Sequence, residues 1–216
     1  MKIFAVANLE QQQEILAKPA TQEVEWTFCK EYSEAAAGDP NSPLFLLSDD
    51  AVESARPSLA GRPVFINSVI TTLKEGNYSP SFIRINAWPG FLSRPIWELA
   101  TADQTGALKI MNVLGWEGVL VGDEPGLVAA RVISMVINEA YFALQEGVSG
   151  KKEIDMAMKL GNNYPFGPME WLDRIGIEKV YTLLNTLSKK DARYAPAPLL
   201  FAEFQQQTSS SHDSPH

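Results

Sequence analysis

Histidine and cysteine, two residue types that often perform acid–base or metal chemistry, are rare in this sequence. Both histidines, His212 and His216, stand in the final segment QQQTSSSHDSPH, whose Ser- and Gln-rich composition predicts a disordered tail over residues 205–216. The folded body therefore has no histidine for proton transfer or metal binding. Cys29 is the single cysteine, which excludes an internal disulfide or a cysteine metal cluster and predicts a buried, inert thiol. We expect no metal site.

One carboxylate, Glu98, interrupts the apolar run PIWELA at 95–100. A glutamate whose pKa is raised by burial can act as a general base. The run itself is typical of a strand, and a polar residue near the end of a strand is an ordinary feature close to a domain boundary. A catalytic base and a structural strand residue are therefore both open interpretations of Glu98.

The first half of the chain alternates short apolar runs with segments that can form helices. The runs are rich in β-branched and aromatic residues, which is typical of strands, and they cover 2–7, 24–28, 44–47, 63–68 and 82–87. Helices are predicted at 9–18 and 48–59, and further strands at 95–100 and 116–123 enclose a predicted helix at 101–115. This alternation predicts an α/β fold with a doubly wound, mostly parallel sheet.

The second half of the chain reads as helical throughout. Apolar residues recur every three or four positions from 126 to about 146, which predicts a long helix with a broad buried face. Further helices are predicted at 151–161, 168–176 and 177–190, with Pro168 in a first turn and Gly161 just after a helix end. We therefore predict two domains, 1–123 and 124–204, of which the second is all-α.

The connection GNNYPFGPMEWLD at 161–173 is unusually apolar and rich in glycine and proline. Prolines fix φ and leave fewer conformations to lose on folding, and glycines permit close approach of backbones. We interpret this connection as a stiff turn between helices that packs on the core, in preference to a ligand-binding loop.

Composition and charge exclude several function classes. The net charge of −8 argues against nucleic acid, because phosphate binding needs a basic stripe and none is visible. No apolar run is long enough to span a bilayer, so we expect no membrane partner. The start, MKIFAVANLEQQQ, lacks the apolar core and cleavage site of a secretory signal, which predicts a cytoplasmic protein.

A series of spaced motifs runs through the helical half. It contains an Asp-x-Pro-Gly opening at 123–126, NEA at 138–140, EG at 146–147, IDMAMKLG at 154–161, YPFGPMEWLDRIG at 164–176 and YAPAPLL at 194–200. In this order and spacing the motifs resemble the C-terminal domain of the 3-hydroxyacyl-CoA dehydrogenase family. The resemblance implies a Rossmann-like N-terminal domain, NAD as cofactor, acyl-CoA substrates of fatty-acid metabolism and a homodimer formed through the helical domain.

The first half resembles the family only in outline. A Gly-x-Gly-x-x-Gly turn after the first strand lets the backbone approach a dinucleotide pyrophosphate. Here the strand runs into ANLEQQQEI, which has no glycine, and Glu10 would repel phosphates. The segment is also shorter than the family's dinucleotide-binding domain. We therefore predict a reduced and degenerate Rossmann-like domain, expect no bound cofactor and attribute NAD to the resemblance alone.

The resemblance also assigns site residues. Thr71 falls at the family's substrate-binding serine, and Arg131 matches the arginine of an Asn-Arg pair, which makes both expected substrate contacts. Glu98 matches the glutamate that orients the catalytic histidine, and counting back twelve residues places Asn86 at that histidine. Asn86 cannot titrate near neutral pH, so proton transfer through it should be slower by about a hundred- to ten-thousand-fold.

Three hypotheses about function follow. The first is an active NAD-dependent 3-hydroxyacyl-CoA dehydrogenase with an atypical site. The second, which we favour, is a pseudoenzyme of the family that has lost cofactor binding and chemistry but retains an acyl-CoA-like ligand. The third is a non-catalytic dimeric scaffold held together by the helical domain, whose long apolar helix face suits both core and subunit contact.

Overall fold

The computed structural model describes residues 1–19, 24–54 and 61–212, and the chain divides into two compact units, Met1–Val128 and Ala129–His216. The first unit is α/β and the second is helical, which confirms the predicted fold class. The division falls a few residues after the predicted boundary near residue 123. Among the described residues, no helix combines the length and the apolar composition that crossing a bilayer requires.

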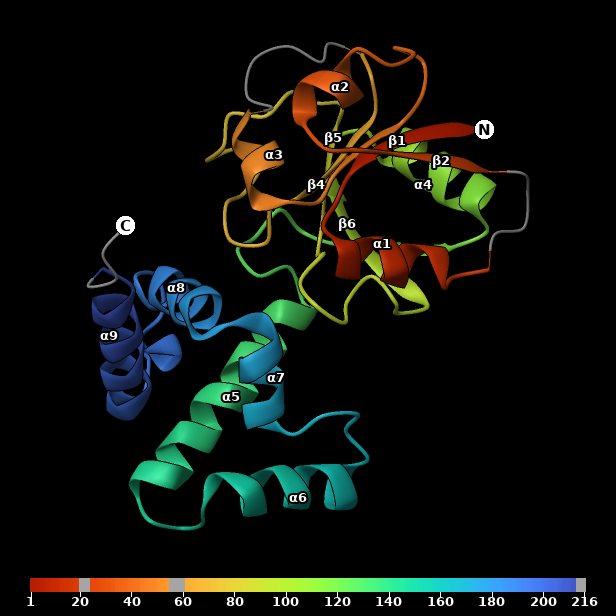
Figure 1. Cartoon of the computed structure of the whole chain (residues 1–216). Coiled ribbons are helices and arrows are strands. Elements are labelled where there is room, and N and C mark those ends of the chain that lie inside the picture. The colour runs from red at the N-terminus through yellow and green to blue at the C-terminus, as the bar shows by residue number, and fades with distance from the viewer. Residues whose placement is uncertain (20–23, 55–60, 213–216) are drawn as a thin grey trace. The chain divides into compact units, whose positions relative to one another are not determined.

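The first unit is built on a seven-stranded sheet of order β2-β1-β3-β4-β5-β6-β7, seen in Figure 1. All neighbouring strands are parallel except the antiparallel pair β5–β6. The strands are β1 Lys2–Val6, β2 Glu25–Cys29, β3 Leu44–Leu46, β4 Val64–Asn67, β5 Phe82–Ile85, β6 Ile96–Thr101 and β7 Glu117–Leu120. Because β2 and β3 flank β1 on opposite sides, the strand order reverses beside β1, where doubly wound sheets open a crevice for ligands.

Helices cover both faces of this sheet. Helices α1 (Leu9–Leu16) and α4 (Gln104–Leu114) lie on one face, and α2 (Tyr32–Ala36) and α3 (Asp49–Ser54) lie on the other, as Figure 1 shows. Successive side chains of β1 point to opposite faces of the sheet, so this strand contributes to the apolar layer on each face. Ile3 and Ala5 join the apolar cluster under α1 and α4, whereas Phe4 and Val6 join the cluster under α2 and α3.

The sequence-based prediction differs from this unit at two helices and agrees with it at Cys29. Helix α2 was not predicted, because its five residues are too few to show a helical period. The helix predicted at 48–59 is observed as α3 over Asp49–Ser54, and residues 55–60 lie outside the described part of the chain. Cys29 is buried as predicted, with 5% of its surface exposed, and burial raises the pKa of its thiol.

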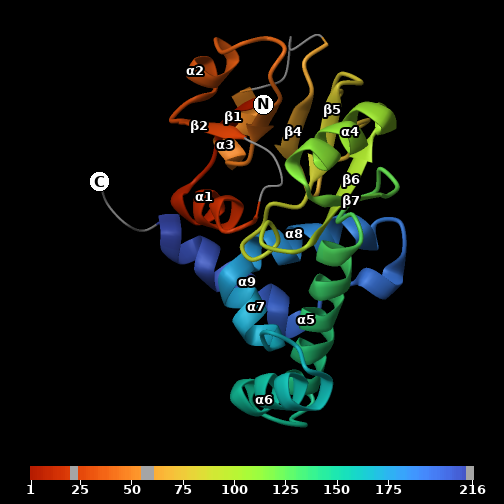
Figure 2. The ribbon, with the colours of Figure 1, turned by 90° about the vertical axis from the view of Figure 1, so that its right-hand side faces the viewer.

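The second unit is a set of helices packed on α5. They are α5 Ala129–Gln145, α6 Lys151–Asn162, α7 Pro168–Ile175, α8 Ile177–Ser188, the 3₁₀ turn η1 Ala192–Tyr194 and α9 Pro198–His212. The apolar positions of α5 face α7, α8 and α9, and Ile137 and Tyr141 are fully buried there. Figure 2 shows α6 set apart at the end of α5, and α6 has no buried residue.

Two helix ends in this unit correct the sequence-based prediction. The tail predicted from residue 205 is helical as far as His212, because α9 continues through the Gln- and Ser-rich segment; residues 213–216 lie outside the described part. Gly161 is not the residue after a helix end. It is inside α6, and Asn163 instead adopts the left-handed conformation, with φ of 54°.

The connection at 161–173 holds the start of α7 with side chains from two helices. Pro168 is in the first turn of α7, as predicted, and the Glu170 carboxylate accepts a hydrogen bond from the Gly167 backbone N–H at 2.9 Å. From α6, Asp155 accepts a hydrogen bond from the Met169 backbone N–H at 2.8 Å. Phe166 packs edge-on against Trp171, with 5.1 Å between ring centroids. The connection is therefore a helix cap within this unit.

A buried asparagine explains why NEA and YAPAPLL occur together in the sequence. Asn138, on α5, is only 2% exposed. Its amide nitrogen donates to the Ala195 carbonyl oxygen at 2.9 Å, and its amide oxygen accepts from the Ala197 N–H at 2.8 Å. Since both ends of the carboxamide are used, Asn138 fixes the extended segment before α9 on α5.

Candidate functional site

Four polar residues form one row across the carboxyl ends of β3, β4 and β5 and the neighbouring part of β6. The strand registers align Leu46, Ile66, Arg84 and Ala100 across these four strands. Ser48, Ser68 and Asn86 lie just beyond the ends of β3, β4 and β5, and Glu98 lies in β6; we call these four residues the strand-end row.

Asn86 and Glu98 are the two predicted catalytic positions, and each lies two residues from the register pair of Arg84 and Ala100, toward the carboxyl end of β5. Asn86 is 8% exposed, and its Oδ1 accepts a hydrogen bond from the Trp88 N–H at 3.1 Å. Its Nδ2 has no hydrogen-bond partner among the described residues. Glu98 Oε2 accepts a hydrogen bond from the Val128 N–H at 3.1 Å. The carboxylate therefore contacts the backbone at the end of the linker.

The two predicted substrate contacts lie in different units. Thr71 follows β4 in the first unit, where its carbonyl oxygen accepts a hydrogen bond from the Ser68 hydroxyl at 2.8 Å. Arg131 lies on α5 in the second unit, and its guanidinium carbon is 5.8 Å from the centre of the Tyr194 ring. Within the first unit, Thr71 thus belongs to the loop that begins at the strand-end row.

A buried arginine fixes that loop. Arg84 is fully buried, and its Nε and Nη2 donate to the carbonyl oxygens of Ser68 and Val69 at 2.7 and 2.9 Å. Its Nη1 forms an ion pair with Asp123, which also accepts a hydrogen bond from the Leu73 N–H at 3.0 Å. Burial lowers the pKa of the Arg84 guanidinium, and the hydrogen bond with Asp123 opposes that shift. This network joins the loop after β4 to the linker after β7.

The turn between β1 and α1 is closed by its own side chains. Asn8 Oδ1 accepts from the Gln11 N–H at 2.9 Å, and Gln11 Oε1 accepts from the Asn8 N–H at 3.0 Å, which is a reciprocal capping box. Gln11 is 6% exposed, and its Nε2 donates to the carbonyl oxygens of Leu47 and Ala87 at 2.9 and 3.2 Å. One side chain therefore ties the start of α1 to the ends of β3 and β5.

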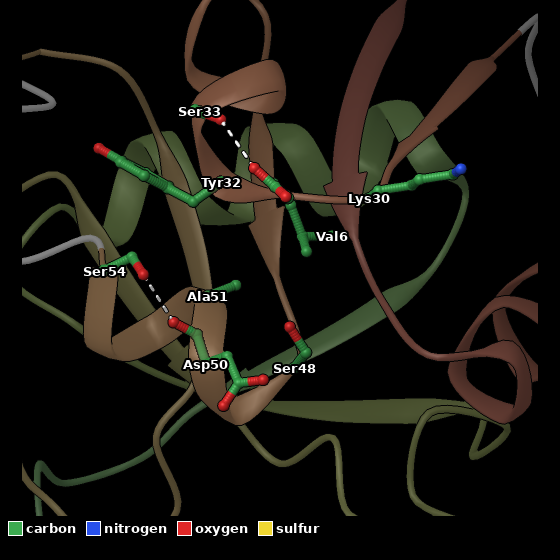
Figure 3. Close-up of a pocket in the computed structure, with 9 residues that line it drawn as sticks. Val6, Lys30, Tyr32, Ser33, Ser48, Asp50, Ala51 and Ser54 are labelled. Atoms are coloured by element: carbon green, nitrogen blue, oxygen red, sulfur yellow. Dashed lines mark hydrogen bonds between the residues drawn. The ribbon is translucent and has the colours of Figure 1, made fainter.

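A pocket lies at the carboxyl ends of β1, β2 and β3, beside the reversal in strand order, and Figure 3 shows it. Tyr32, Ser48 and Ser54 line it, and Lys30 extends away from the other labelled side chains. Two carboxylates, Glu31 and Asp50, also line it. Since these acids outnumber the single lysine, the pocket suits neutral hydroxyl or carbonyl groups better than phosphates.

These residues do not fit the pyrophosphate of a dinucleotide at the first turn. A pyrophosphate needs free backbone N–H groups at the helix N-terminus and glycines that let it approach. Here the Gln11 N–H is bonded to Asn8, and the buried Gln11 side chain crosses the strand ends. Within the described ranges, no group of three or more His, Cys, Asp or Glu side chains is placed to hold a metal ion.

Comparisons with known proteins show which family the helical unit resembles. Residues 126–210 match the family model described as the 3-hydroxyacyl-CoA dehydrogenase C-terminal domain. This region belongs to the 3-hydroxyacyl-CoA dehydrogenase family. A 96-residue stretch of the chain is 43% identical to 3-hydroxyadipyl-CoA dehydrogenase of Escherichia coli K12, and this match covers 44% of the chain and 20% of that protein.

A second relative gives a similar result. A 107-residue stretch is 40% identical to a probable 3-hydroxybutyryl-CoA dehydrogenase of Bacillus subtilis, and this match covers 47% of the chain and 37% of that protein. The chain therefore matches well under half the length of these 3-hydroxyacyl-CoA dehydrogenase relatives.

Among solved structures, (S)-3-hydroxybutyryl-CoA dehydrogenase from Ralstonia eutropha is similar in fold. It matches with a TM-score of 0.65 and 24% identity, over 85% of this chain and 70% of that one. The likeness covers the α/β unit as well as much of the helical unit, because 85% of the chain exceeds what either unit contains alone. The first half of the chain is therefore also similar in fold to this dehydrogenase and is Rossmann-like.

Two important residues were missed by the sequence analysis. The sequence could have indicated the role of Gln11, because Asn-x-x-Gln at the start of a helix is the pattern of a capping box. Arg84 had a weaker one, since a lone charge inside the apolar run FIRINA needs a buried partner. That partner, Asp123, is far away in sequence, and only the fold brings the two together.

Proposed function

We propose that this protein is a member of the 3-hydroxyacyl-CoA dehydrogenase family, related to fatty-acid metabolism, that binds an acyl-CoA-like ligand and does not catalyse hydride transfer. The observation that carries the proposal is the pair of changes in the first unit. By the family resemblance, the non-titrating Asn86 falls at the expected position of the acid–base residue, and the capping box of Asn8 and Gln11 closes the first turn.

Each change removes a separate requirement of the dehydrogenase reaction. Hydride transfer at a 3-hydroxyacyl thioester needs a group that takes the hydroxyl proton, and losing that group slows such reactions by about a hundred- to ten-thousand-fold. It also needs the nicotinamide cofactor, whose pyrophosphate would meet the side chains of the closed turn. Because the two defects are independent, repairing either one alone should not give dehydrogenase activity.

The proposal is tested by thermal shift and by enzyme assay on the full chain. Acetoacetyl-CoA and butyryl-CoA should raise the melting temperature, because a ligand that binds only the folded state stabilises it. NAD and NADH should give no shift at millimolar concentration, and acetoacetyl-CoA should cause no oxidation of NADH. Measurable NADH oxidation would support the active dehydrogenase with an atypical site and would overturn the proposal.

A second candidate, the dimeric scaffold, is favoured by the surface of α6. Three large apolar side chains on and beside this helix are exposed: Val148 at 71%, Met156 at 57% and Leu160 at 82%. Each of them would gain about 1.5–3 kcal/mol if a subunit covered it fully. We propose that α6 forms part of a homodimer contact through the helical unit, whether or not a ligand binds.

Light scattering tests the dimer. The wild-type chain should have twice the monomer mass at micromolar concentration, and Leu160→Lys should shift it toward monomer. Leu108→Lys is the matched control, since Leu108 is also exposed, at 38%, but lies on α4 in the other unit. A wild-type monomer would overturn the scaffold, and equal effects of the two substitutions would remove α6 from the contact.

A further inference from the structure

Helix α6 turns a stripe of charged side chains toward the rest of its unit. Lys151, Asp155 and Lys159 recur every four residues, so they lie on one face of the helix. The Lys151 ammonium contacts both carboxylate oxygens of Glu203 at 2.9 Å, and the Lys159 ammonium forms an ion pair with the Glu170 carboxylate. Between them, Asp155 accepts a hydrogen bond from a backbone N–H of α7 at 2.8 Å. One charged side chain in each turn therefore bonds α6 to α7 or α9.

Apolar packing contributes little to the position of this helix. None of its twelve residues is buried, Ile154 and Met158 are half-buried, and the apolar Met156 and Leu160 are exposed. In most helices of folded proteins the apolar stripe faces the core and provides most of the stability. The polar contacts of α6 must provide a large share of it instead, and partly exposed ion pairs are individually weak.

These features predict that α6 opens more easily than the helices beside it. Segments with few buried apolar contacts separate from a protein at a lower free energy than its core does. A helix of twelve residues is marginal in water on its own, so α6 would also lose its helical hydrogen bonds once it left α7. Left-handed residues, Gly147 before the helix and Asn163 after it, bend the chain on both sides of this segment.

A pocket lies where α6 meets the rest of the helical unit. Its volume is about 380 Å³, and its lining comes from all five α-helices of the unit. Lys151, Lys152 and Asp155 line it from α6, whereas the buried Met169 and Leu172 line it from α7. Because α6 supplies one side of the pocket, movement of this helix away from α7 would uncover the apolar side chains on the other side.

We propose that α6 is a lid over this pocket, held shut by Lys151, Asp155 and Lys159, and that it opens while the rest of the helical unit stays folded. Salt screens each charge contact, so the open state gains population as ionic strength rises. The exposed apolar side chains that the dimer candidate uses are not those that hold the lid. The inference therefore depends neither on the dimer nor on the acyl-CoA-like ligand.

Hydrogen exchange of the full chain, followed by mass spectrometry of peptides from α6 and α8, tests the lid. Helix α8 is the reference, because five of its residues are buried. We expect α6 to exchange faster than α8 at low ionic strength. In about 1 M NaCl, where the screening length falls to about 3 Å, α6 should exchange faster still relative to α8.

Two variants remove the ion pairs and keep the other hydrogen bonds of the same side chains. Glu203→Gln retains an acceptor for the Tyr141 hydroxyl, and Glu170→Gln retains an acceptor for the Gly167 N–H. Each should speed the exchange of α6 by about two- to fivefold at low salt and reduce its response to salt. Glu139→Gln is the matched control, since it makes the same change at an exposed position of α5.

Several results would overturn the lid. Exchange of α6 as slow as that of α8, no response to salt, or an equal effect of Glu139→Gln would each show that the charge contacts do not hold it. Equal acceleration of α8 in Glu203→Gln or Glu170→Gln would show that the whole unit unfolds instead. Protection of α6 that rises with protein concentration and is the same in both variants would assign it to a partner subunit, and this too would overturn the charged latch.

Discussion

Two glycines six residues apart, Gly161 and Gly167, should respond oppositely to alanine. A Cβ at Gly167 would overlap the Asp155 side chain, which reaches across that position to accept the Met169 N–H. At Gly161, inside α6, a Cβ would meet no atom within 4 Å. Neither residue needs a positive φ, so the difference lies in space alone.

The magnitudes follow from these surroundings. In Gly167→Ala the new methyl group must displace the Asp155 side chain. This overpacking at the start of α7, together with a weaker charge-assisted hydrogen bond, should lower the free energy of unfolding by about 1–3 kcal/mol. Gly161→Ala should stabilise by about 0.4–1 kcal/mol, because alanine narrows the unfolded ensemble and suits a helix interior. With a urea m-value of about 2 kcal/mol per molar, the midpoints move by about 1 M downward and about 0.3 M upward.

Urea unfolding followed by circular dichroism at 222 nm measures both changes. An unchanged m-value shows that stability moved and not the extent of unfolding. If Gly167→Ala costs less than about 0.5 kcal/mol, or if Gly161→Ala destabilises to the same extent, the close approach of Asp155 is not what requires glycine at 167.

The remaining predictions concern buried charge and pH. Asp123→Ala should cost about 3 kcal/mol, because it leaves the fully buried Arg84 unpaired, whereas Glu25→Ala, which breaks an exposed ion pair, should stay within about 0.5 kcal/mol in the same urea assay. Burial, followed by the hydrogen bond to Glu203, raises the pKa of Tyr141. The stabilisation by the protonated Tyr141 hydroxyl is therefore complete below the pKa of about 10 in the unfolded chain and is lost above it. The difference in free energy of unfolding between wild type and Tyr141→Phe should therefore be constant from pH 7 to 9 and decrease at higher pH.

Whether the sequence predicts a structural feature depends on how far apart in the chain the residues that determine it lie. The strands and the long helix α5 follow from local periodicity, and Pro168 marks the start of α7 through its own φ. The short helix α2 and the helical end of α9 were not predicted, since both depend on packing or on weak propensity in a polar segment.

The candidate site shows the same limit. Family motifs supplied Asn86 and Glu98, and in the structure each of them lies two residues from the β5–β6 register pair of Arg84 and Ala100. Nothing local to Asn86 indicates that its nitrogen lacks a partner, because that depends on which atoms the neighbouring strands bring near. The Arg84 network likewise joins residues from three separate segments.

The hydrogen bonds of the buried Gln11 side chain also limit which substitutions the first turn can accept. A glycine at position 11 would open the first turn, but it would also release the carbonyl oxygens at the ends of β3 and β5 that the side chain now holds. The variant would lose stability at the step meant to restore a cofactor, while Asn86 would still lack a titrating group. Under the proposed function, substitutions toward dinucleotide binding thus pass through less stable variants with no dehydrogenase activity to select.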